Sequence, residues 1–334
     1  MSANASRLRA AAGTYEVWYT TWNHPVTNQG FWLRFLVEAP TTGPARGELW
    51  FAAFDPRHPD RTFGIHERFS LSDVVTETTP FTVAIAGSHF ADDRTTGALA
   101  GAGHDVRWDL RWTPLAPAPL RMLPDLMYAR GGVGETTVLS PNPRVALTGT
   151  LVIDGETLAF DGAIAGQSHV WGRKHAHSWT WGRCAEFAGA PDGLLELLGV
   201  RLQRAGVLLP PLVLVSLDLD GERHRFNQFR HVVKNRATWG TGRVKFAAWS
   251  PRIKLVGELV CTPDQMVLAP YVDPDGTELT CANTEIGDAR VTVHQRSGMR
   301  WRETHRLVGR QRAHFEIGGR LGDPAITRRH VRIR

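Results

Sequence analysis

Residues 15–22 read YEVWYTTW, and residues 31–38 read FWLRFLVE. Both runs are rich in aromatic and β-branched side chains, which are typical of strands, and neither shows the spacing of an amphipathic helix. Similar short runs recur along the chain between Gly, Pro, Asn and Asp residues, at positions 48–54, 81–85, 106–112, 145–153, 158–164, 212–219, 223–232, 254–261, 290–294 and 313–317. The sequence therefore predicts an all-β protein.

The sequence also predicts several of the turns between these runs. Asp-Gly pairs at Asp154-Gly155, Asp220-Gly221 and Asp275-Gly276 supply residues that tolerate positive φ where hairpins reverse. Strands that recur every 8 to 12 residues favour a sandwich or a barrel, because closure removes exposed sheet edges. Only residues 193–200, GLLELLGV, suggest one or two helical turns.

The length of 334 residues fits two domains of about 150 residues each or one large β assembly. The best boundary lies near residues 162–172, so we expect an N-terminal unit at 1–165 and a C-terminal unit at 166–334. Residues 114–143 hold six of the 20 prolines, and we interpret them as a long connection or a lid.

The charge balance is weakly basic, with 39 Lys and Arg against 33 Asp and Glu. Only residues 328–334 form a basic run, which we interpret as a solvated tail. No nucleic-acid motif accompanies this run, so we expect no nucleic-acid partner, while peripheral membrane contact stays open. The oligomeric state is not predicted.

The cysteines and the first residues bear on the subcellular localisation of the protein. Cys184, Cys261 and Cys281 have no CxxC spacing, which favours a reducing compartment. Residues 1–14 lack the apolar core of a secretory signal, and no window reaches the ~20 apolar residues of a membrane span. We expect a cytoplasmic protein.

Residues 166–187 read GQSHVWGRKHAHSWTWGRCAEF and hold three of the 12 tryptophans and three of the 14 histidines. Large indole faces beside imidazoles suit a site that holds a lipophilic molecule and moves a proton on it. The alternative is a purely structural role, in which these side chains pack an ordinary β core.

This segment resembles the lipocalin-like superfamily of carotenoid hydratases, tocopherol cyclases, Diels–Alderase-type cyclases and AttH-like proteins. The resemblance rests on Ser168-His169-Val170-Trp171-Gly172, on Trp179-Thr180-Trp181, and on the Trp, Cys and Phe pattern at residues 181–187. It implies two lipocalin-like antiparallel β-barrels packed together, and chemistry on isoprenoid or polyketide substrates. Ser168 stands where hydratase-type members carry an aspartate, and a serine hydroxyl is no substitute for a carboxylic acid.

The candidate proton-transfer residues are His169 first, then His175, His177 and Glu186. A histidine on a strand is also often held by structural hydrogen bonds, and Glu186 is also placed to pair with Arg183. The candidate aromatic walls, which would shield a carbocation by cation–π attraction, are Trp171, Trp179, Trp181, Trp22, Trp32 and Trp108.

A metal site is the competing interpretation. His175 and His177 would lie on one face of a strand, with His169 as a third ligand, but Trp181 and Gly182 occupy the spacing at which a cupin-type site has a carboxylate. We therefore expect no metal and no cofactor; no nucleotide-binding loop or GxSxG motif is present, and Cys184 is interpreted as a small buried residue.

Three hypotheses about the function remain. The first is a cofactor-independent enzyme that cyclises, isomerises, hydrates or dehydrates a lipophilic isoprenoid, polyene or polyketide by acid assistance. The second is a carrier or sensor that binds such a ligand unchanged. The third is a metal-dependent β-barrel enzyme.

Overall fold

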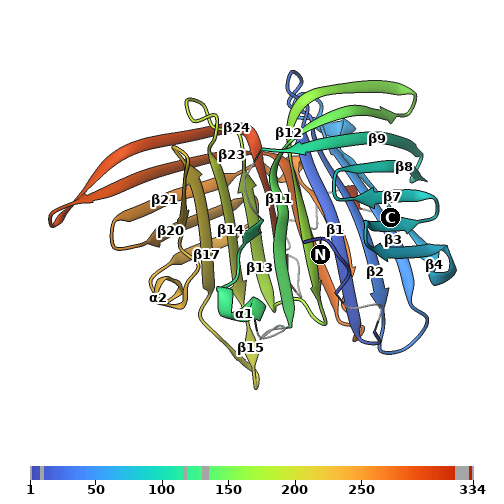
Figure 1. Cartoon of the computed structure of the whole chain (residues 1–334), viewed down its shortest axis with the longest axis horizontal. Coiled ribbons are helices and arrows are strands. Elements are labelled where there is room, and N and C mark those ends of the chain that lie inside the picture. Colours follow the sequence, from blue (N-terminus) through green and yellow to red (C-terminus); the bar gives the residue numbers. More distant parts are fainter. Residues whose placement is uncertain (1, 8–10, 116–118, 130–134, 320–330, 333–334) are drawn as a thin grey trace.

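The computed structural model describes the chain except for residues 1, 8–10, 116–118, 130–134, 320–330 and 333–334. Two large curled sheets lie side by side, the blue and green strands of sheet A and the yellow to red strands of sheet B (Figure 1). Sheet A forms a nearly closed barrel and sheet B forms a second curled barrel. The expected all-β architecture of two antiparallel β-barrels packed together is confirmed.

Sheet A contains twelve strands within the described residues, in the order β4-β3-β2-β1-β12-β11-β9-β8-β7-β6-β5 with β10 beside β11. Its strands are β1 (Thr14–Asn23), β2 (Gly30–Ala39), β3 (Arg46–Phe54), β4 (Phe63–Ser70), β5 (Val74–Thr78), β6 (Phe81–Ile85), β7 (Ser88–Ala91), β8 (Arg94–Gly101), β9 (His104–Pro114), β10 (Leu120–Arg121), β11 (Thr136–Ile153) and β12 (Glu156–Gly172).

Sheet B contains eleven strands within the described residues, in the order β18-β17-β14-β13-β24-β23-β21-β20-β19, with β22 beside β23 and β25 parallel to β22. Its strands are β13 (Ser178–Cys184), β14 (Leu194–Arg201), β17 (Leu212–Leu219), β18 (Glu222–Arg225), β19 (Arg236–Gly240), β20 (Arg243–Trp249), β21 (Ile253–Val260), β22 (Val267–Val272), β23 (Glu278–Ser297), β24 (Arg300–Gly319) and β25 (Val331–Arg332).

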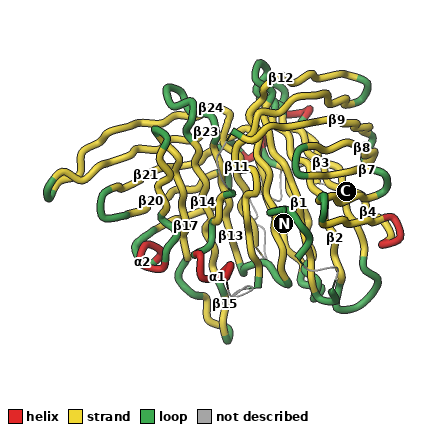
Figure 2. Tube along the Cα trace, in the orientation of Figure 1, coloured by secondary structure: helices red, strands yellow, loops and turns green. Residues whose placement is uncertain are grey.

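Helices are short and few, as the red segments of Figure 2 show. The α-helices are α1 (Asp125–Ala129) and α2 (Phe229–Val232), the 3₁₀ turns are Pro59–Arg61, Leu71–Asp73 and Pro263–Gln265, and a separate ribbon joins β15 (Gln203–Arg204) to β16 (Val207–Leu208). No helix among the described residues has the length and apolar character needed to cross a bilayer.

Side chains fill the interior of each barrel. In sheet A, Trp22, Phe51 and Trp108 belong to one buried apolar cluster. In sheet B, Leu197, Phe246 and Phe315 belong to another.

The outer faces of the two barrels also bury apolar residues where the barrels meet. Trp32 and Trp50 of sheet A pack with Trp179, Tyr271 and neighbouring residues of sheet B. As a result β2 is buried at all ten positions, because one face lies in the barrel and the other against the second barrel.

The expected strands are present, with two differences. Residues 193–200 do not form helical turns but strand β14, whose two faces are both buried. Residues 223–232 do not form one strand, because β18 ends at Arg225 and α2 follows. The expected turns are observed, with positive φ at Asp154, Gly155, Asp220, Gly221 and Gly276.

The chain passes from one barrel to the other between β12 and β13. The boundary that we drew at 165/166 lies inside β12, and sheet A continues to Gly172 before sheet B begins at Ser178. The basic run at 328–334 lies outside the described residues except for Val331 and Arg332 in β25.

Candidate functional site

A cavity of about 700 Å³ lies between the two barrels. We call it the inter-barrel cavity, and its size is within the usual range of small-molecule sites. Sheet A contributes Tyr15, Val17, Tyr19, Trp32, Arg34 and Val170 to its wall, and sheet B contributes Trp179, Trp181, Leu198, Val200, Leu214, Tyr271 and Glu316.

The strand pattern explains how β1 serves both the cavity and the barrel core. Trp18 and Trp22 point into the barrel of sheet A, whereas Tyr15, Val17 and Tyr19 line the cavity. Because side chains alternate between the two faces of a strand, one aromatic-rich run supplies both sites.

His175 is the imidazole that lines this cavity. Its Nδ1 lies 2.6 Å from Oδ1 of Asp273, and its backbone N–H also donates to the Asp273 carboxylate at 3.1 Å. Asp273 is almost completely buried. The carboxylate therefore orients the ring and favours a proton on Nδ1, which leaves Nε2 as the nitrogen that can exchange a proton.

Aromatic rings hold His175 on both sides. Tyr15 stacks on it with the ring centroids 4.8 Å apart, and Trp179 stacks on it at 5.0 Å. The indole N–H of Trp179 donates to Oε1 of Glu316 at 2.7 Å. Burial raises the pKa of Tyr15 well above its ordinary value, so this phenol stays neutral.

A second buried polar group lies between the barrels near the cavity. The Arg183 guanidinium donates to the carbonyl of Ala165 at 2.9 Å, and its Nε lies 3.7 Å from Glu196. Nδ1 of His314 lies 3.1 Å from the Glu285 carboxylate. Burial raises the pKa of Glu285 and lowers that of His314. His314 also joins the barrels, because its ring nitrogens lie 2.7 Å from Thr21 and 2.7 Å from Asn23 of β1.

His169, our first candidate, lies on the opposite face of β12 from the cavity. It is fully buried, with Nε2 2.8 Å from Oε1 of Glu16 and Nδ1 3.1 Å from the carbonyl of Ala3. It stacks on Trp18 at 5.1 Å between ring centroids. In this position His169 connects the N-terminal segment to the barrel of sheet A through its contact with the carbonyl of Ala3.

The expected pair of imidazoles on one strand face is wrong. His175 and His177 lie in the irregular connection between β12 and β13, because the chain changes sheets there. His177 does not line the cavity, and its buried Nδ1 has no hydrogen-bond partner among the described residues. In the same part of the chain, no three His, Cys, Asp or Glu side chains are grouped closely enough to hold a metal ion.

Glu186 also lies away from the cavity. Its carboxylate is 3.4 Å from Nε of Arg312, and the pairing with Arg183 that we weighed is wrong, because Arg183 lies beside Glu196 instead. Burial raises the pKa of Glu186.

The six candidate tryptophans separate into two groups. Trp179, Trp181 and Trp32 line the cavity. Trp22 and Trp108 lie inside the barrel of sheet A. Trp171 contacts His169 at 4.7 Å between ring centroids, on the far face of β12.

The proline-rich segment that we interpreted as a connection or lid borders the cavity. Leu123, Pro124, Leu126 and Met127 line it, and the Asp125 carboxylate of α1 accepts two hydrogen bonds from Arg225. Phe229 of α2 also lines the cavity. Leu126 is 47% exposed and Phe229 59% exposed, so these two helices mark the mouth.

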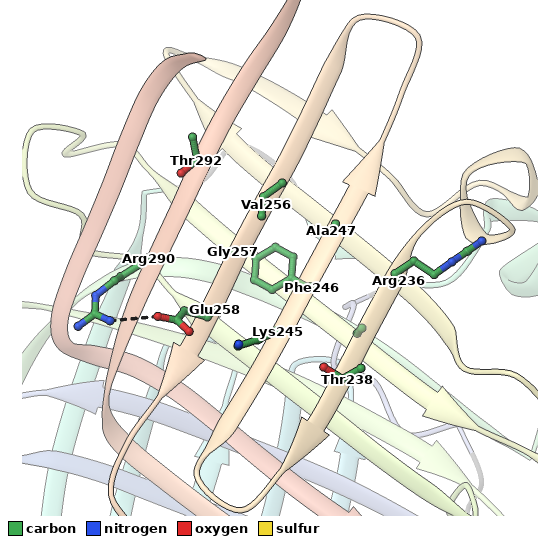
Figure 3. A pocket seen from close by; sticks show the side chains of 11 residues that line it. Arg236, Thr238, Lys245, Phe246, Ala247, Val256, Gly257, Glu258, Arg290 and Thr292 are labelled. Atoms are coloured by element: carbon green, nitrogen blue, oxygen red, sulfur yellow. Dashed lines mark hydrogen bonds and ion pairs between the residues drawn. The ribbon is translucent and has the colours of Figure 1, made fainter. Parts of the chain in front are cut away.

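A second hollow, of about 500 Å³, lies on strands β19, β20, β21 and β23. Figure 3 shows Phe246 in its centre and the ion pair of Arg290 with Glu258 at its edge. Its charged side chains are exposed or half-buried, and Phe246 belongs to the barrel core. It offers no enclosed reactive group.

The sequence did not point to Tyr15, Arg34, Asp273, Tyr271 and Glu316 as parts of the site. Tyr15 could have been predicted as a site residue, because it alternates with core residues along β1. Asp273 could not have been predicted, because its contact with His175 joins positions 98 residues apart. Cys184 is buried as expected, and burial raises the pKa of its thiol to about 12.

Comparison with known proteins agrees with this architecture. A protein of Mycobacterium tuberculosis described as uncharacterized, from strains H37Rv and CDC 1551, is 29% identical over 329 residues, which cover 97% of this chain and 92% of the relative. The solved structure of an AttH protein from Nitrosomonas europaea has a TM-score of 0.57 and 16% identity and covers 96% of this chain and 99% of that one.

Kievitone hydratase from Nectria haematococca has a TM-score of 0.53 and 12% identity, and the match covers 95% of this chain and 92% of that one. At these identities the two solved structures support the fold. The family model described as tocopherol cyclase-like matches residues 86–319, well over half of the sequence. The chain belongs to the tocopherol cyclase-like family.

Proposed function

We propose that this protein is a cyclase- or hydratase-type enzyme that moves a proton on a lipophilic substrate held in the inter-barrel cavity. The observation that carries the proposal is the His175 imidazole, oriented by Asp273 at the wall of a largely apolar cavity. The family and the hydratase among its structural neighbours support the enzyme class.

The chemistry follows from the residues around His175. With Nδ1 bound to the carboxylate, Nε2 donates a proton when the ring is protonated and accepts one when it is neutral. A proton added to one carbon of an alkene and removed from another gives isomerisation, and attack on the cation by an internal group or by water gives ring closure or hydration. The faces of Trp179, Trp181 and Tyr271 would stabilise the positive charge.

The test is turnover in D₂O with isoprenoid, polyene and prenylated phenol probes, analysed by mass spectrometry. We expect deuterium in a product or in recovered substrate, and a loss of about 10²- to 10⁴-fold with His175→Gln. His177→Gln is the matched control, since His177 does not line the cavity. Equal turnover by the two variants would refute the role of His175.

The carrier hypothesis predicts that a probe binds and is recovered chemically unchanged, without deuterium. The metal hypothesis predicts a stoichiometric transition metal in the purified protein, which elemental analysis detects. Both measurements use the same preparation as the turnover assay.

We also propose that the substrate enters from a lipid surface. Leu126 and Phe229 each line the cavity and expose an apolar side chain, and Leu212 beside them is 41% exposed. Neighbouring apolar side chains at the mouth of a cavity would let a lipophilic molecule pass from a membrane without crossing water.

A further inference from the structure

Arg34 of β2 is a buried cation at the wall of the inter-barrel cavity. The residue is only 5% exposed and lines the cavity with His175 and Tyr271. Its guanidinium carbon lies 4.4 Å from the ring centroid of Tyr271, 5.4 Å from Trp50 and 5.9 Å from Trp32. Three aromatic rings therefore surround the charge.

This guanidinium has no hydrogen-bond or ion-pair partner within the part of the chain that the structure describes. Nη1 is buried and unpartnered, and no carboxylate of the described residues lies within 4 Å of the group. Arg183, the other arginine buried between the barrels, donates to two backbone carbonyls and lies beside Glu196. A buried charge without a partner is costly, and aromatic faces offset only part of that cost.

The acidic groups around Arg34 are already engaged. Asp273 accepts from His175, and Glu316 accepts from Trp179. Glu38 pairs with Arg46 at 2.7 Å through one oxygen, while its buried Oε1 has no hydrogen-bond partner among the described residues and makes no ion pair with Arg34. Glu48 contacts Arg46, His66, Arg68 and the Trp50 indole. None of these carboxylates pairs with Arg34, and the cavity that Arg34 lines is the space from which a ligand could supply its partner.

We infer that Arg34 receives a carboxylate carried by the substrate, so that the ligand is an amphipathic acid whose apolar body lies along the cavity. A guanidinium binds a carboxylate through two parallel N–H donors, which satisfies the unpartnered Nη1. A diphosphate would need several cations. The other basic residues at the wall are paired, Lys174 with Asp275 and Arg204 with Glu135.

This inference names the substrate class of the proposed function and rests on the same cavity. It also places the chemistry, because Tyr271 contacts both Arg34 and His175, the latter at 5.6 Å between ring centroids. A carboxylate held by Arg34 would bring the carbon atoms next to it close to His175. Proton transfer is then expected near the acid end of the substrate.

The experiment compares ligands that share one hydrocarbon body and differ in the head group: geranylgeranoic acid, its methyl ester, geranylgeraniol and geranylgeranyl diphosphate. Binding is measured by titration calorimetry with the full chain. We expect the acid to bind at least about tenfold more tightly than the ester or the alcohol. Equal affinities for acid, ester and alcohol, or tightest binding of the diphosphate, would overturn the inference.

Variants test whether the preference for the acid over the ester depends on Arg34. Arg34→Gln should bring the acid to within about twofold of the ester while the ester affinity changes little, and Arg34→Lys should keep part of the preference. Arg204→Gln removes another positive charge at the wall, but one that is exposed and paired, and should keep the full preference. If Arg34→Gln keeps the preference as well, Arg34 is not the receptor.

The outcome is independent of turnover. His175→Gln should still prefer the acid, because the head group contacts Arg34. If the wild-type protein prefers the acid and yields no product, the proposed enzyme fails while the carboxylate site stands. If Arg34→Gln does not fold, the ligand series with wild type and Arg34→Lys decides.

Discussion

Nδ1 of His175 and Oδ1 of Asp273 lie 2.6 Å apart, although the two residues come from different connections. His175 stands between β12 and β13, where the chain crosses from one barrel to the other, and Asp273 directly follows β22 of sheet B. The contact therefore joins the inter-barrel connection to sheet B. It fixes the imidazole at the wall of the inter-barrel cavity.

Asp273→Asn should lower kcat about tenfold or more and change KM much less, because the amide no longer favours the tautomer with the proton on Nδ1. Asp275→Asn is the matched control in the same loop, where Asp275 pairs with the exposed end of Lys174. Similar kinetics for the two variants would contradict a positioning role for Asp273.

Gly166→Ala should destabilise the fold by about 2 kcal/mol or more. An added Cβ would lie 1.7 Å from Nη1 of the buried Arg183, so the guanidinium would have to leave its carbonyl partners. Gly240→Ala in β19 is the control, because no atom lies within 4 Å of its added Cβ. The free energy of unfolding from urea titration checks both variants, and equal stabilities would refute this account of Gly166.

Glu196 should make the protein less stable as pH rises from about 4.5 to about 7. Burial raises its folded pKa to about 7, against a lowering influence of Arg183, so between these values the folded state binds more protons than the unfolded state. The slope is at most about 1.4 kcal/mol per pH unit. Glu196→Gln should flatten the curve in this window, and an unchanged slope would count against the assignment.

Glu48 should act in the opposite direction and at lower pH. Burial raises its pKa, but His66, Arg46 and Arg68 outweigh burial and bring it to about 2. Its stabilising contribution is complete above about 4.5 and is lost as pH falls toward 2. Unfolding titrations of Glu48→Gln from about pH 2.5 to 5 should show a shallower acid loss than wild type, and a curve parallel to wild type would argue against it.

Replacing Leu126 and Phe229 together by Ser should weaken flotation with lipid vesicles about fivefold or more, because both apolar side chains at the mouth are lost. The melting temperature should change little, since both residues are largely exposed. Met299→Ser is the control, because Met299 is 93% exposed at the far hairpin tip between β23 and β24. An equal loss with Met299→Ser would mean that the contact is not specific to the mouth.

β1 and β2 are buried on both faces and were predicted from their aromatic and β-branched residues. Period-two patterning predicted strands such as β9, in which buried and exposed residues alternate. It failed at β14, where Leu195 and Leu197 point into the barrel while Leu198 and Val200 line the cavity. β14 is buried on both faces and has no aromatic residue, so its leucines lack the alternation of a half-buried strand and resemble a helical run.

The candidate site was predicted in part. Trp179 and Trp181 were predicted to be substrate walls, a role that stays a prediction, and both line a cavity. Trp22 shares their residue type and stands on β1 beside cavity residues, yet it faces the barrel core. Residue type alone does not tell which face of a strand points to which compartment, because the chain has two interiors and an interface that all require aromatic side chains.

The all-β class, the turns and the aromatic and imidazole content of the middle segment could be predicted from the sequence, because they depend on neighbours a few residues apart. The sequence could not predict that the hollow lies between the barrels, that His175 rather than His169 faces it, or that Arg34 is unpartnered among the described residues. These features arise from packing two barrels together, which brings into contact residues whose separation along the chain carries no local signal.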